Sequence, residues 1–328
     1  MKIVWALDPF ESETRPDPLA IRELREWHET AGAEIRPVYV LQPDIPIAHE
    51  MPGIDLDPKD QIRATQFTLR HYLKDLDAEW TSPPAVIYDR SPTAASAVQR
   101  LLAFARLEGA KLIVVSSHGR RGLSRLLLGS FAEQLLNHSD IPLLFLSHAP
   151  SENQGRERRP LFATDFSSYT LAAFEEFLES AGALFPVLTI FHQLERPPTL
   201  DFGGISANPM AFLPTTYWDD QEKWAREQAD AWVKRAEAKG ITARAIVVPA
   251  HGRISENILE AARTENACLV AMASRSGPVE SMLLGSVARG VSRPHSLPVW
   301  VCGRTLLELR AEPTLVPNPV ISSGQEVS

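Results

Sequence analysis

The stretch SSHGRRGLSRLLLGS, residues 116–130, decides the fold of this chain. It follows the apolar run KLIVV and precedes a segment with helical periodicity. Gly119 and Gly129 stand ten residues apart, and Ser130 follows the second glycine. A glycine-rich loop that leaves a buried strand and opens a helix is typical of α/β proteins, in which such a loop holds a ligand.

The chain contains this pattern twice. Gly-Ser opens both GSFAEQLLNHSDIPLLFLS, from Gly129, and GSVARGVSRPHSLPVWVCG, from Gly285, and a proline follows 13 residues after each glycine. The halves also begin alike, because Asp8 and Asp165 each follow an apolar run. From its aspartate to its Gly-Ser pair, one half spans 121 residues and the other 120. Together with a length of 328 residues, this repeat predicts two copies of one domain.

Each half alternates predicted strands with predicted helices. In the first half, strands are expected at residues 2–7, 34–41, 85–89, 111–116 and 142–147, and helices at 17–32, 60–80, 93–109 and after the glycine loop. In the second half, strands are expected at 161–164, 186–192, 242–248, 268–273 and 298–302, and helices from Ser167, through 224–240 and over 255–266. This alternation predicts an α/β fold, a doubly wound parallel sheet in each half with helices on both faces.

Three further segments complete the predicted organisation. Domain 1 is expected at residues 1–150 and domain 2 at 151–303, joined by the polar linker SHAPSENQGRERRP. The tail, 304–328, starts with a predicted helical turn and becomes rich in Pro and Ser, so we expect it to be partly disordered. Residues 195–220 form an insertion that is too long for a neutral connection, and it either caps a pocket or packs against a partner.

Charge and hydropathy exclude several classes of function. A net charge of -8 and a pI of about 5.7 argue against a general nucleic-acid-binding protein. No apolar run approaches the roughly 18 residues that span a bilayer, and the N-terminus has no secretion signal. We therefore expect a soluble, cytoplasmic protein with neither nucleic acid nor membrane as a partner.

The cysteines and histidines predict neither a disulfide nor a metal site. The nine histidines form no recognised metal-binding pair. Cys268 begins one predicted strand and Cys302 ends its neighbour. Parallel pairing puts these positions at opposite ends of the sheet, beyond the roughly 7 Å limit for a bridge. The sequence therefore predicts two free thiols.

Candidate ligand-binding residues follow the predicted strands. Ligands of open parallel sheets bind beyond the carboxyl ends of the strands, where Asp8 and the glycine loop both belong. A helix that starts at Gly129 and Ser130 offers unpaired N–H groups that suit phosphate, and Asp8 suits a ribose. Taken singly, these residues also have structural explanations, because Ser130 or Asp8 can cap a helix and Gly119 can turn the chain. The prediction depends on their meeting at one edge.

The segment SSHGRRGLSRLLLGSFAEQLL resembles the signature of the universal stress protein family, as do ATDFS in the second half and the S-x-x-P pattern at residues 139–142. The resemblance covers residues 1 to about 303 and implies a tandem universal stress protein. It implies two five-stranded parallel sheets with strand order 3-2-1-4-5, and domains that associate through their fifth strands. It also implies that a Gly-x2-Gly-x9-Gly-Ser/Thr loop binds ATP or a related adenine nucleotide.

Carried over position by position, the resemblance implies a nucleotide site in the first half. Asp8 matches the acidic residue after the first strand, and Val40 the second-strand position that meets adenine. Ser116 stands where the family has its first glycine, a departure expected to weaken binding if the backbone must approach the ribose there. The implied nucleotide-binding residues are Asp8, Val40, Ser116, Gly119, Arg120, Gly129, Ser130 and Phe131.

The second half departs further from the family pattern. Counted back from Gly285, the first two glycine positions are occupied by Met272 and Arg275, and Gln193 stands opposite Val40. We expect that this half does not hold ATP in the family manner. The degenerate second site comprises Asp165, Met272, Arg275, Gly285 and Ser286.

Three functions are compatible with these residues. The leading hypothesis is a stress-response regulatory protein whose first half binds ATP or AMP, with or without Mg²⁺, and whose shape changes on binding. The second is an interaction module that binds no nucleotide and acts only through protein partners. The third, an adenylyl-transfer enzyme, is disfavoured because no SGG loop follows the first strand. No catalytic residues are predicted, and slow ATP hydrolysis is the most activity expected.

Association is expected from the sheet edges. The fifth strands, 142–147 and 298–302, are apolar, and exposed apolar edges favour pairing. The two halves can pair within one chain. A homodimer and an unidentified protein partner are expected in addition.

Overall fold

The computed structural model describes residues 1–10, 16–42, 57–76, 79–91, 93–116, 130–146, 158–194, 200–202, 205–207, 217–249, 252–274, 287, 291 and 297–310. The strands are β1 Lys2–Ala6, β2 Glu34–Leu41, β3 Ala85–Tyr88, β4 Leu112–Ser116, β5 Leu143–Leu146, β6 Leu161–Ala163, β7 Val187–Gln193, β8 Leu200–Phe202, β9 Ile205–Ala207, β10 Thr242–Val248, β11 Val270–Ala273 and β12 Val299–Cys302. The helices are α1 Pro18–Ala31, α3 Pro58–Tyr72, α4 Ala94–Glu108, α5 Ser130–His138, α6 Ser168–Ser180, the 3-10 helix η1 Gly182–Leu184, α7 Tyr217–Ala238, α8 Ile254–Thr264 and α10 Arg304–Arg310.

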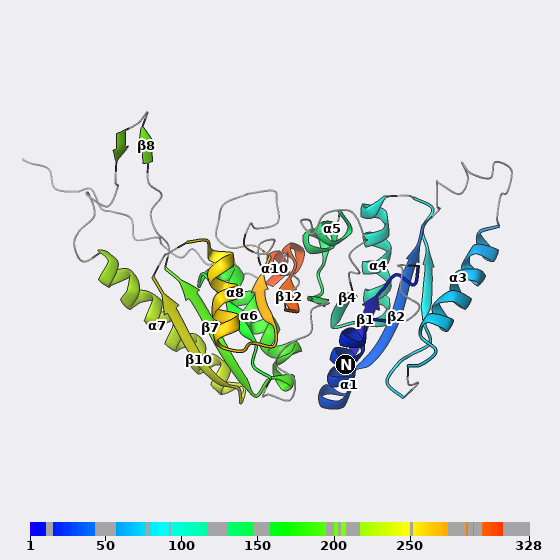
Figure 1. Ribbon diagram of the computed structural model, residues 1–328, viewed down its shortest axis with the longest axis horizontal. Helices are drawn as coiled ribbons and strands as arrows, with labels where there is room; N and C mark the ends of the chain where they lie inside the picture. Colours follow the sequence, from blue (N-terminus) through cyan, green and yellow to red (C-terminus); the bar gives the residue numbers. More distant parts are fainter. Residues whose placement is uncertain are drawn as a thin grey trace, which may run out of the picture.

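The two halves share one ten-stranded sheet (Figure 1). Its order is β3-β2-β1-β4-β5 followed by β12-β11-β6-β7-β10, so each half has the predicted order 3-2-1-4-5. Pairing within each half is parallel, whereas β5 and β12 pair antiparallel, with Phe145 opposite Val299 and Leu143 opposite Val301. The expectation that the halves pair through their fifth strands is confirmed.

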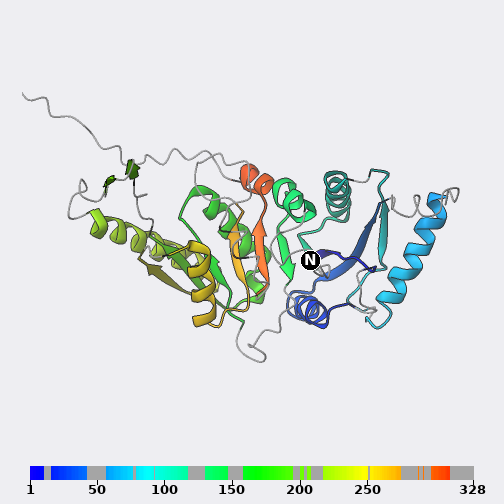
Figure 2. The same cartoon turned by 45° about the horizontal axis from the view of Figure 1, so that its top comes forward.

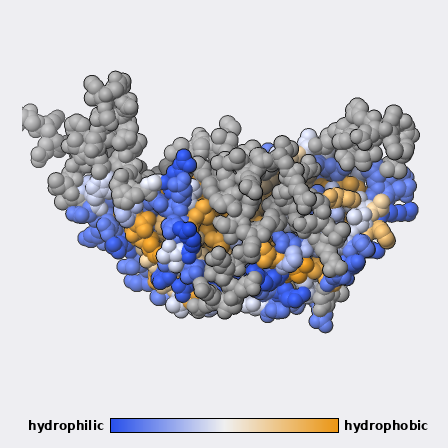
Figure 3. Space-filling view, in the orientation of Figure 1, coloured by the Kyte–Doolittle hydropathy of each residue, from blue (hydrophilic) through white to orange (hydrophobic). Residues whose placement is uncertain are grey.

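Strands with apolar runs are buried on both faces, as their composition requires. Successive residues of β4 point to opposite cores: Leu112 and Val114 join one cluster, and Ile113 and Val115 join the other. Helices α1, α3, α6 and α7 contribute to the first cluster, and α4, α5 and α8 to the second. Figure 2 shows these helices on both sides of the sheet. In Figure 3 the outer helix α7 turns mostly hydrophilic side chains to the surface, and on α3 hydrophilic side chains are mixed with exposed apolar ones.

Helix α1 begins and ends at local sequence signals, whereas α3 ends earlier than its periodicity predicts. The Asp17 side chain accepts a hydrogen bond from the Leu19 N–H at the start of α1, and Gly32 ends that helix at φ 59. The helix predicted over 60–80 is wrong in extent, because α3 ends at Tyr72. Trp80 is buried, and its carbonyl accepts a hydrogen bond from the Ile35 N–H at 3.0 Å. Because Trp80 is bound to β2, the chain leaves the helix after Tyr72 and returns to the sheet.

The insertion and the tail contain more regular structure than expected. Within residues 195–220, β8 and β9 form an antiparallel hairpin apart from the main sheet (Figure 1), and α7 already begins at Tyr217. The tail begins with a full helix, α10, and its residues Leu306 and Leu307 are buried in the core. Residues 311–328, where disorder is predicted, lie outside the described part of the chain.

Helix α10 docks on the end of α5, so the second half closes on the first. The Leu306 N–H donates to the Ser139 carbonyl at 3.2 Å, and the Thr305 hydroxyl donates to the Asn137 carbonyl at 3.1 Å. The N-terminal end of α10 thus satisfies carbonyl groups that the C-terminal end of α5 leaves unpaired. Through these hydrogen bonds, α5 of the first half contacts α10 of the second half directly.

Arg310 anchors α10 within the second half, and Arg158 links the second half to the first. Arg310 at the end of α10 forms ion pairs with Glu176 at 2.5 Å and Glu179 at 3.2 Å on α6. Burial raises the pKa of Glu176, although the charge of Arg310 opposes this shift. Arg158, just before β6, pairs with Glu23 of α1 at 2.5 Å and lies 5.1 Å from the ring centre of Phe185.

Gly303 is the position where the docking of α10 is most sensitive to added volume. A Cβ there would lie 2.8 Å from the Ser139 carbonyl oxygen and 2.9 Å from that of Leu136. Because both atoms are backbone, Gly303→Ala should lower the free energy of unfolding by about 1–3 kcal/mol in urea denaturation. Leu309→Ala is the control, because Leu309 is 72% exposed on the same helix. Equal stability of Gly303→Ala and wild type would contradict this docking.

The two cysteines are free thiols, as predicted. Burial raises the pKa of Cys302, and it raises that of Cys268 to about 12 although Arg158 beside it acts in the opposite direction. A raised pKa lowers the thiolate fraction, so both should react with iodoacetamide much more slowly in the native protein than in urea at about pH 8. Fast native labelling of either cysteine, measured by mass spectrometry, would contradict this assignment.

Candidate functional site

The carboxyl ends of β1, β2 and β4 bring three predicted residues of the first half to one edge. Ala6 of β1 pairs with Val38 of β2. Asp8 and Val40 each lie two residues further on, and Ser116 ends β4 on the other side of β1. Neighbouring strands are about 4.8 Å apart, so the three residues lie close together. Strand β1 is also where the strand order reverses, the usual ligand position in such sheets.

Helix α5 contributes the other described residues. Ser130 is its first residue and is exposed, whereas Phe131 packs partly against the same core as Val40. The remaining predicted residues of this site, Gly119, Arg120 and Gly129, lie outside the described residues.

Asp8 is not the cap of the helix that follows it. One of its carboxylate oxygens accepts a hydrogen bond from the Phe10 N–H at 2.9 Å, and Asp17 caps α1 instead. Within the described part of the chain, the second oxygen of Asp8 accepts no hydrogen bond. Asp165 differs, because its carboxylate accepts hydrogen bonds from the Ser167 N–H and the Thr170 hydroxyl at the start of α6. Asp8 therefore keeps acceptor capacity at the edge.

The hydroxyl of Ser116 belongs to the core. It accepts a hydrogen bond of 2.7 Å from the indole N–H of Trp5, and both residues are buried. A buried indole N–H without a hydrogen-bond partner would be destabilising. Ser116 provides the acceptor for the Trp5 N–H, which a glycine at this position could not do. Its side chain points to the core that contains Trp5 rather than into the loop. The departure from the family glycine is thus explained by packing.

The register of the second half corrects the position assigned to Met272. Ala163 pairs with Met272 as Ala6 pairs with Val115, so Met272 corresponds to Val115 and is buried in the core. Ala273 takes the place of Ser116. The count from Gly285 is off by one because this loop is one residue shorter. Arg275, Gly285 and Ser286 lie outside the described residues.

The polar core pair of the first half is replaced as a unit. Trp5 pairs with Val114 as Phe162 pairs with Ala271, so Phe162 corresponds to Trp5. Both the indole N–H and the hydroxyl are therefore missing at Phe162 and Ala273. A donor and its acceptor lost together leave neither group unsatisfied.

The edge of the second half is lined by different chemistry. Gln193 occupies the position of Val40, and its carboxamide oxygen accepts a hydrogen bond from Asn257 at 2.9 Å. The Phe166 ring lies 4.5 Å from the His192 ring and 5.3 Å from that of Trp232. Amide groups and packed aromatic rings thus lie at this edge, where the first half has the apolar Val40.

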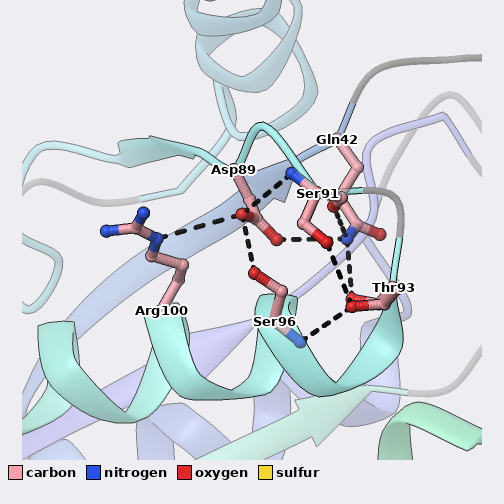
Figure 4. Close-up of polar contacts among 6 residues, drawn as sticks. All are labelled: Gln42, Asp89, Ser91, Thr93, Ser96 and Arg100. Atoms are coloured by element: carbon pink, nitrogen blue, oxygen red, sulfur yellow. Dashed lines mark hydrogen bonds and ion pairs between the residues drawn. The ribbon is translucent and has the colours of Figure 1, made fainter.

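A polar cluster beside Val40 was not anticipated from the sequence (Figure 4). The Asp89 carboxylate, 2% exposed after β3, accepts hydrogen bonds from the Ser91 N–H, the Ser96 hydroxyl and the Gln42 amide, and Arg100 lies 3.9 Å away. The only sequence signal is the segment DRSPTAAS, an aspartate followed by hydroxyl residues at the start of a helix. The cluster joins the end of β2 to the first turn of α4.

The described residues contain no group of three or more His, Cys, Asp and Glu side chains that could hold a metal ion. No helix among them is long and apolar enough to cross a membrane.

The sequence profile of the Universal stress protein family matches residues 1–147 and 158–303. The chain belongs to the universal stress protein family. No curated protein matches it in sequence. The two matched stretches coincide with the two halves of the sheet, so this universal stress protein is a tandem of two family domains.

Solved structures share the fold of this universal stress protein. A universal stress protein from Archaeoglobus fulgidus DSM 4304 covers 92% of the chain and 96% of its own length at 21% identity, with a TM-score of 0.57. A functionally unknown protein from Pseudomonas aeruginosa PAO1 covers 94% and 95% at 13% identity, with a TM-score of 0.56. Another Archaeoglobus fulgidus universal stress protein was solved in complex with dAMP, but its TM-score of 0.29 is too low to argue from.

A double-mutant cycle tests the Trp5–Ser116 bond. Ser116→Ala leaves the buried indole N–H without its acceptor and should lower the free energy of unfolding by about 1–3 kcal/mol. The double variant Trp5→Phe, Ser116→Ala reproduces the pair found in the second half and should cost less than the sum of the single changes. Urea denaturation of the four proteins measures the coupling.

Trp300 offers a control for this cycle. It is buried on β12, and its indole N–H has no partner in the described structure. Trp300→Phe removes an unpaired donor and should cost less than Trp5→Phe. Additive single changes, or equal costs at the two tryptophans, would show that the hydrogen bond contributes nothing.

Proposed function

We propose that this universal stress protein binds an adenine nucleotide, ATP or AMP, in its first domain and acts as a nucleotide-responsive regulatory protein. The observation that carries the proposal is the convergence of Asp8, Val40 and Ser116 at the carboxyl edge around β1, where the strand order reverses. The free oxygen of Asp8 suits a ribose hydroxyl, and the partly buried Val40 suits the flat face of a base.

The start of α5 suits the phosphate groups. Its first N–H groups and helix dipole favour an anion, and the exposed Ser130 adds a hydroxyl. Gly119, Arg120 and Gly129 precede this helix and would complete the phosphate loop. The Ser116 hydroxyl is bound to Trp5, so it does not compete for the ligand. Mg²⁺ would then be held by the phosphates and water rather than by a protein cluster.

The fold supplies a route from this site to the second domain. Helix α5 starts at the proposed phosphate position and ends against α10, which is anchored on α6 through Arg310 and Glu176. A nucleotide that shifts α5 would therefore move contacts of both domains. The second domain, whose edge carries Gln193 in place of Val40, acts as the partner surface and not as a second nucleotide site.

The alternative function is an interaction module that binds no nucleotide. The β8–β9 hairpin favours it, because this hairpin stands apart from the main sheet and is not needed to complete the fold (Figure 1). The fifth strands are already paired within the chain, so a homodimer would need another surface.

Isothermal titration of ATP, ADP and AMP, with and without Mg²⁺, tests the proposal on protein stripped of ligand. We expect about one site per chain in the wild type. Gly129→Glu should weaken binding at least a hundredfold, because two like charges roughly 4 Å apart near a protein surface repel by about 4 kcal/mol. Gly285→Glu, the same change in the second half, is the matched control and should leave binding unchanged.

Two results would contradict the proposal. Two sites per chain, one of them lost in Gly285→Glu, would show that the second domain also binds nucleotide. A folded wild type that binds none of the three nucleotides would leave the interaction module as the better account.

A further inference from the structure

We infer that Gln42 is a specificity-determining residue of the first domain, where its carboxamide oxygen accepts a hydrogen bond from the 6-amino group of an adenine base. The inference rests on the proposed nucleotide site and names the feature of the base that the site reads. It distinguishes 6-amino purines from 6-oxo purines such as hypoxanthine and guanine.

Gln42 lies beside the position proposed for the base. It directly follows β2 and is two residues beyond Val40. Side chains two residues apart on a strand point to the same face, at a separation of roughly 6–7 Å. A base against Val40 is therefore within reach of the Gln42 side chain.

The orientation of the Gln42 carboxamide is fixed by its partners (Figure 4). Its amide nitrogen lies 3.2 Å from an Asp89 oxygen, 2.7 Å from the Ser91 carbonyl and 2.9 Å from the Thr93 carbonyl. All three partners are acceptors, so exchanging the nitrogen and oxygen of the amide would set oxygen against three oxygens. The nitrogen must face the cluster, and the oxygen must be the remaining free end.

The acceptors that fix Gln42 are themselves held in place. Asp89 is nearly fully buried and accepts hydrogen bonds from the Ser91 N–H at 3.2 Å and the Ser96 hydroxyl at 2.9 Å. The Thr93 carbonyl also accepts the Ala97 N–H at 3.1 Å in the first turn of α4. Gln42 is thus bound to a helix end and a strand end rather than to a free loop.

Among the described residues, no donor occupies the oxygen of Gln42, and the side chain is partly exposed. The 6-amino group of adenine can donate to this oxygen, whereas a 6-oxo group would oppose one acceptor with another. A site with a fixed acceptor therefore rejects the 6-oxo base more strongly than it would reject a base of the wrong size.

Among the described residues of the second domain, no such arrangement is found. Gln193 is level with Val40, two residues before the position that corresponds to Gln42, and its oxygen accepts a hydrogen bond from Asn257. Helix α8, which follows β10, begins after Arg253 without a side-chain cap. Within the described part of the chain, the cluster that orients Gln42 is found only in the domain with the proposed nucleotide site.

The test compares ATP with inosine triphosphate, which carries oxygen in place of the 6-amino group. Both ligands are titrated into the wild type and into Gln42→Lys. Lysine can donate to Asp89 and to the Ser91 and Thr93 carbonyls but has no acceptor, so the cluster is kept and the proposed reading group is lost. We expect the wild type to prefer ATP at least about tenfold, and Gln42→Lys to lose most of that preference.

Gln99→Lys is the matched control, because it makes the same charge change at an exposed position of α4. Gln42→Ala, checked for folding by thermal unfolding, is the second variant and should also lose the preference. An ATP preference unchanged in folded Gln42→Lys and Gln42→Ala would overturn the role of Gln42 while leaving nucleotide binding intact. No binding of either triphosphate to the wild type would overturn the nucleotide site itself, and the inference with it.

Discussion

Strands β5 and β12 each end a five-stranded parallel sheet, so in an isolated half each would expose a row of unpaired backbone N–H and C=O groups. Both strands are also buried at every residue, which no surface edge tolerates. Their antiparallel pairing removes both problems within one chain. The docking of α10 on α5 and the ion pair between Arg158 and Glu23 depend on this contact, because it brings the two halves into one sheet.

The two halves differ in what their structure must provide. The second half provides the edge strand β12 and the docking helix α10. Neither requires space for a ligand at the carboxyl ends of its strands. Its edge is accordingly filled by the Phe166 ring and by the hydrogen bond between Gln193 and Asn257. The first half has an apolar residue, Val40, where the second has Gln193, and one carboxylate oxygen of Asp8 accepts no hydrogen bond from the described residues. The proposed ligand site and the assembly contacts thus lie in different copies of one fold.

The sequence was sufficient wherever the signal is local or repeated. The duplication predicted two copies of one domain, the family resemblance implied the strand order and the pairing of fifth strands, and Gly32 marked the end of α1. It was insufficient wherever the partner is distant. Trp5 and Ser116 are 111 residues apart, and Gln42 and Asp89 are 47 apart, so neither bond has a pattern along the chain. The position of Met272 was missed because a count along a loop cannot show that the loop is shorter, whereas strand register can.

The buried pair and the buried cluster also explain why departures from the family pattern need not weaken the site. Ser116 replaces a glycine, yet its hydroxyl is bound to Trp5 and the pair is absent as a whole from the second half. Asp89 places a carboxylate in a nearly dry position, which is tolerable only because a backbone N–H, a hydroxyl and an amide all donate to it. The Asp89 carboxylate and the carbonyls of Ser91 and Thr93 accept hydrogen bonds from the amide nitrogen of Gln42 and prevent its carboxamide from turning. The buried charge of Asp89 already requires the Gln42 carboxamide to be held in one orientation. The carboxamide can therefore discriminate between ligands without a further loss of conformational entropy on binding.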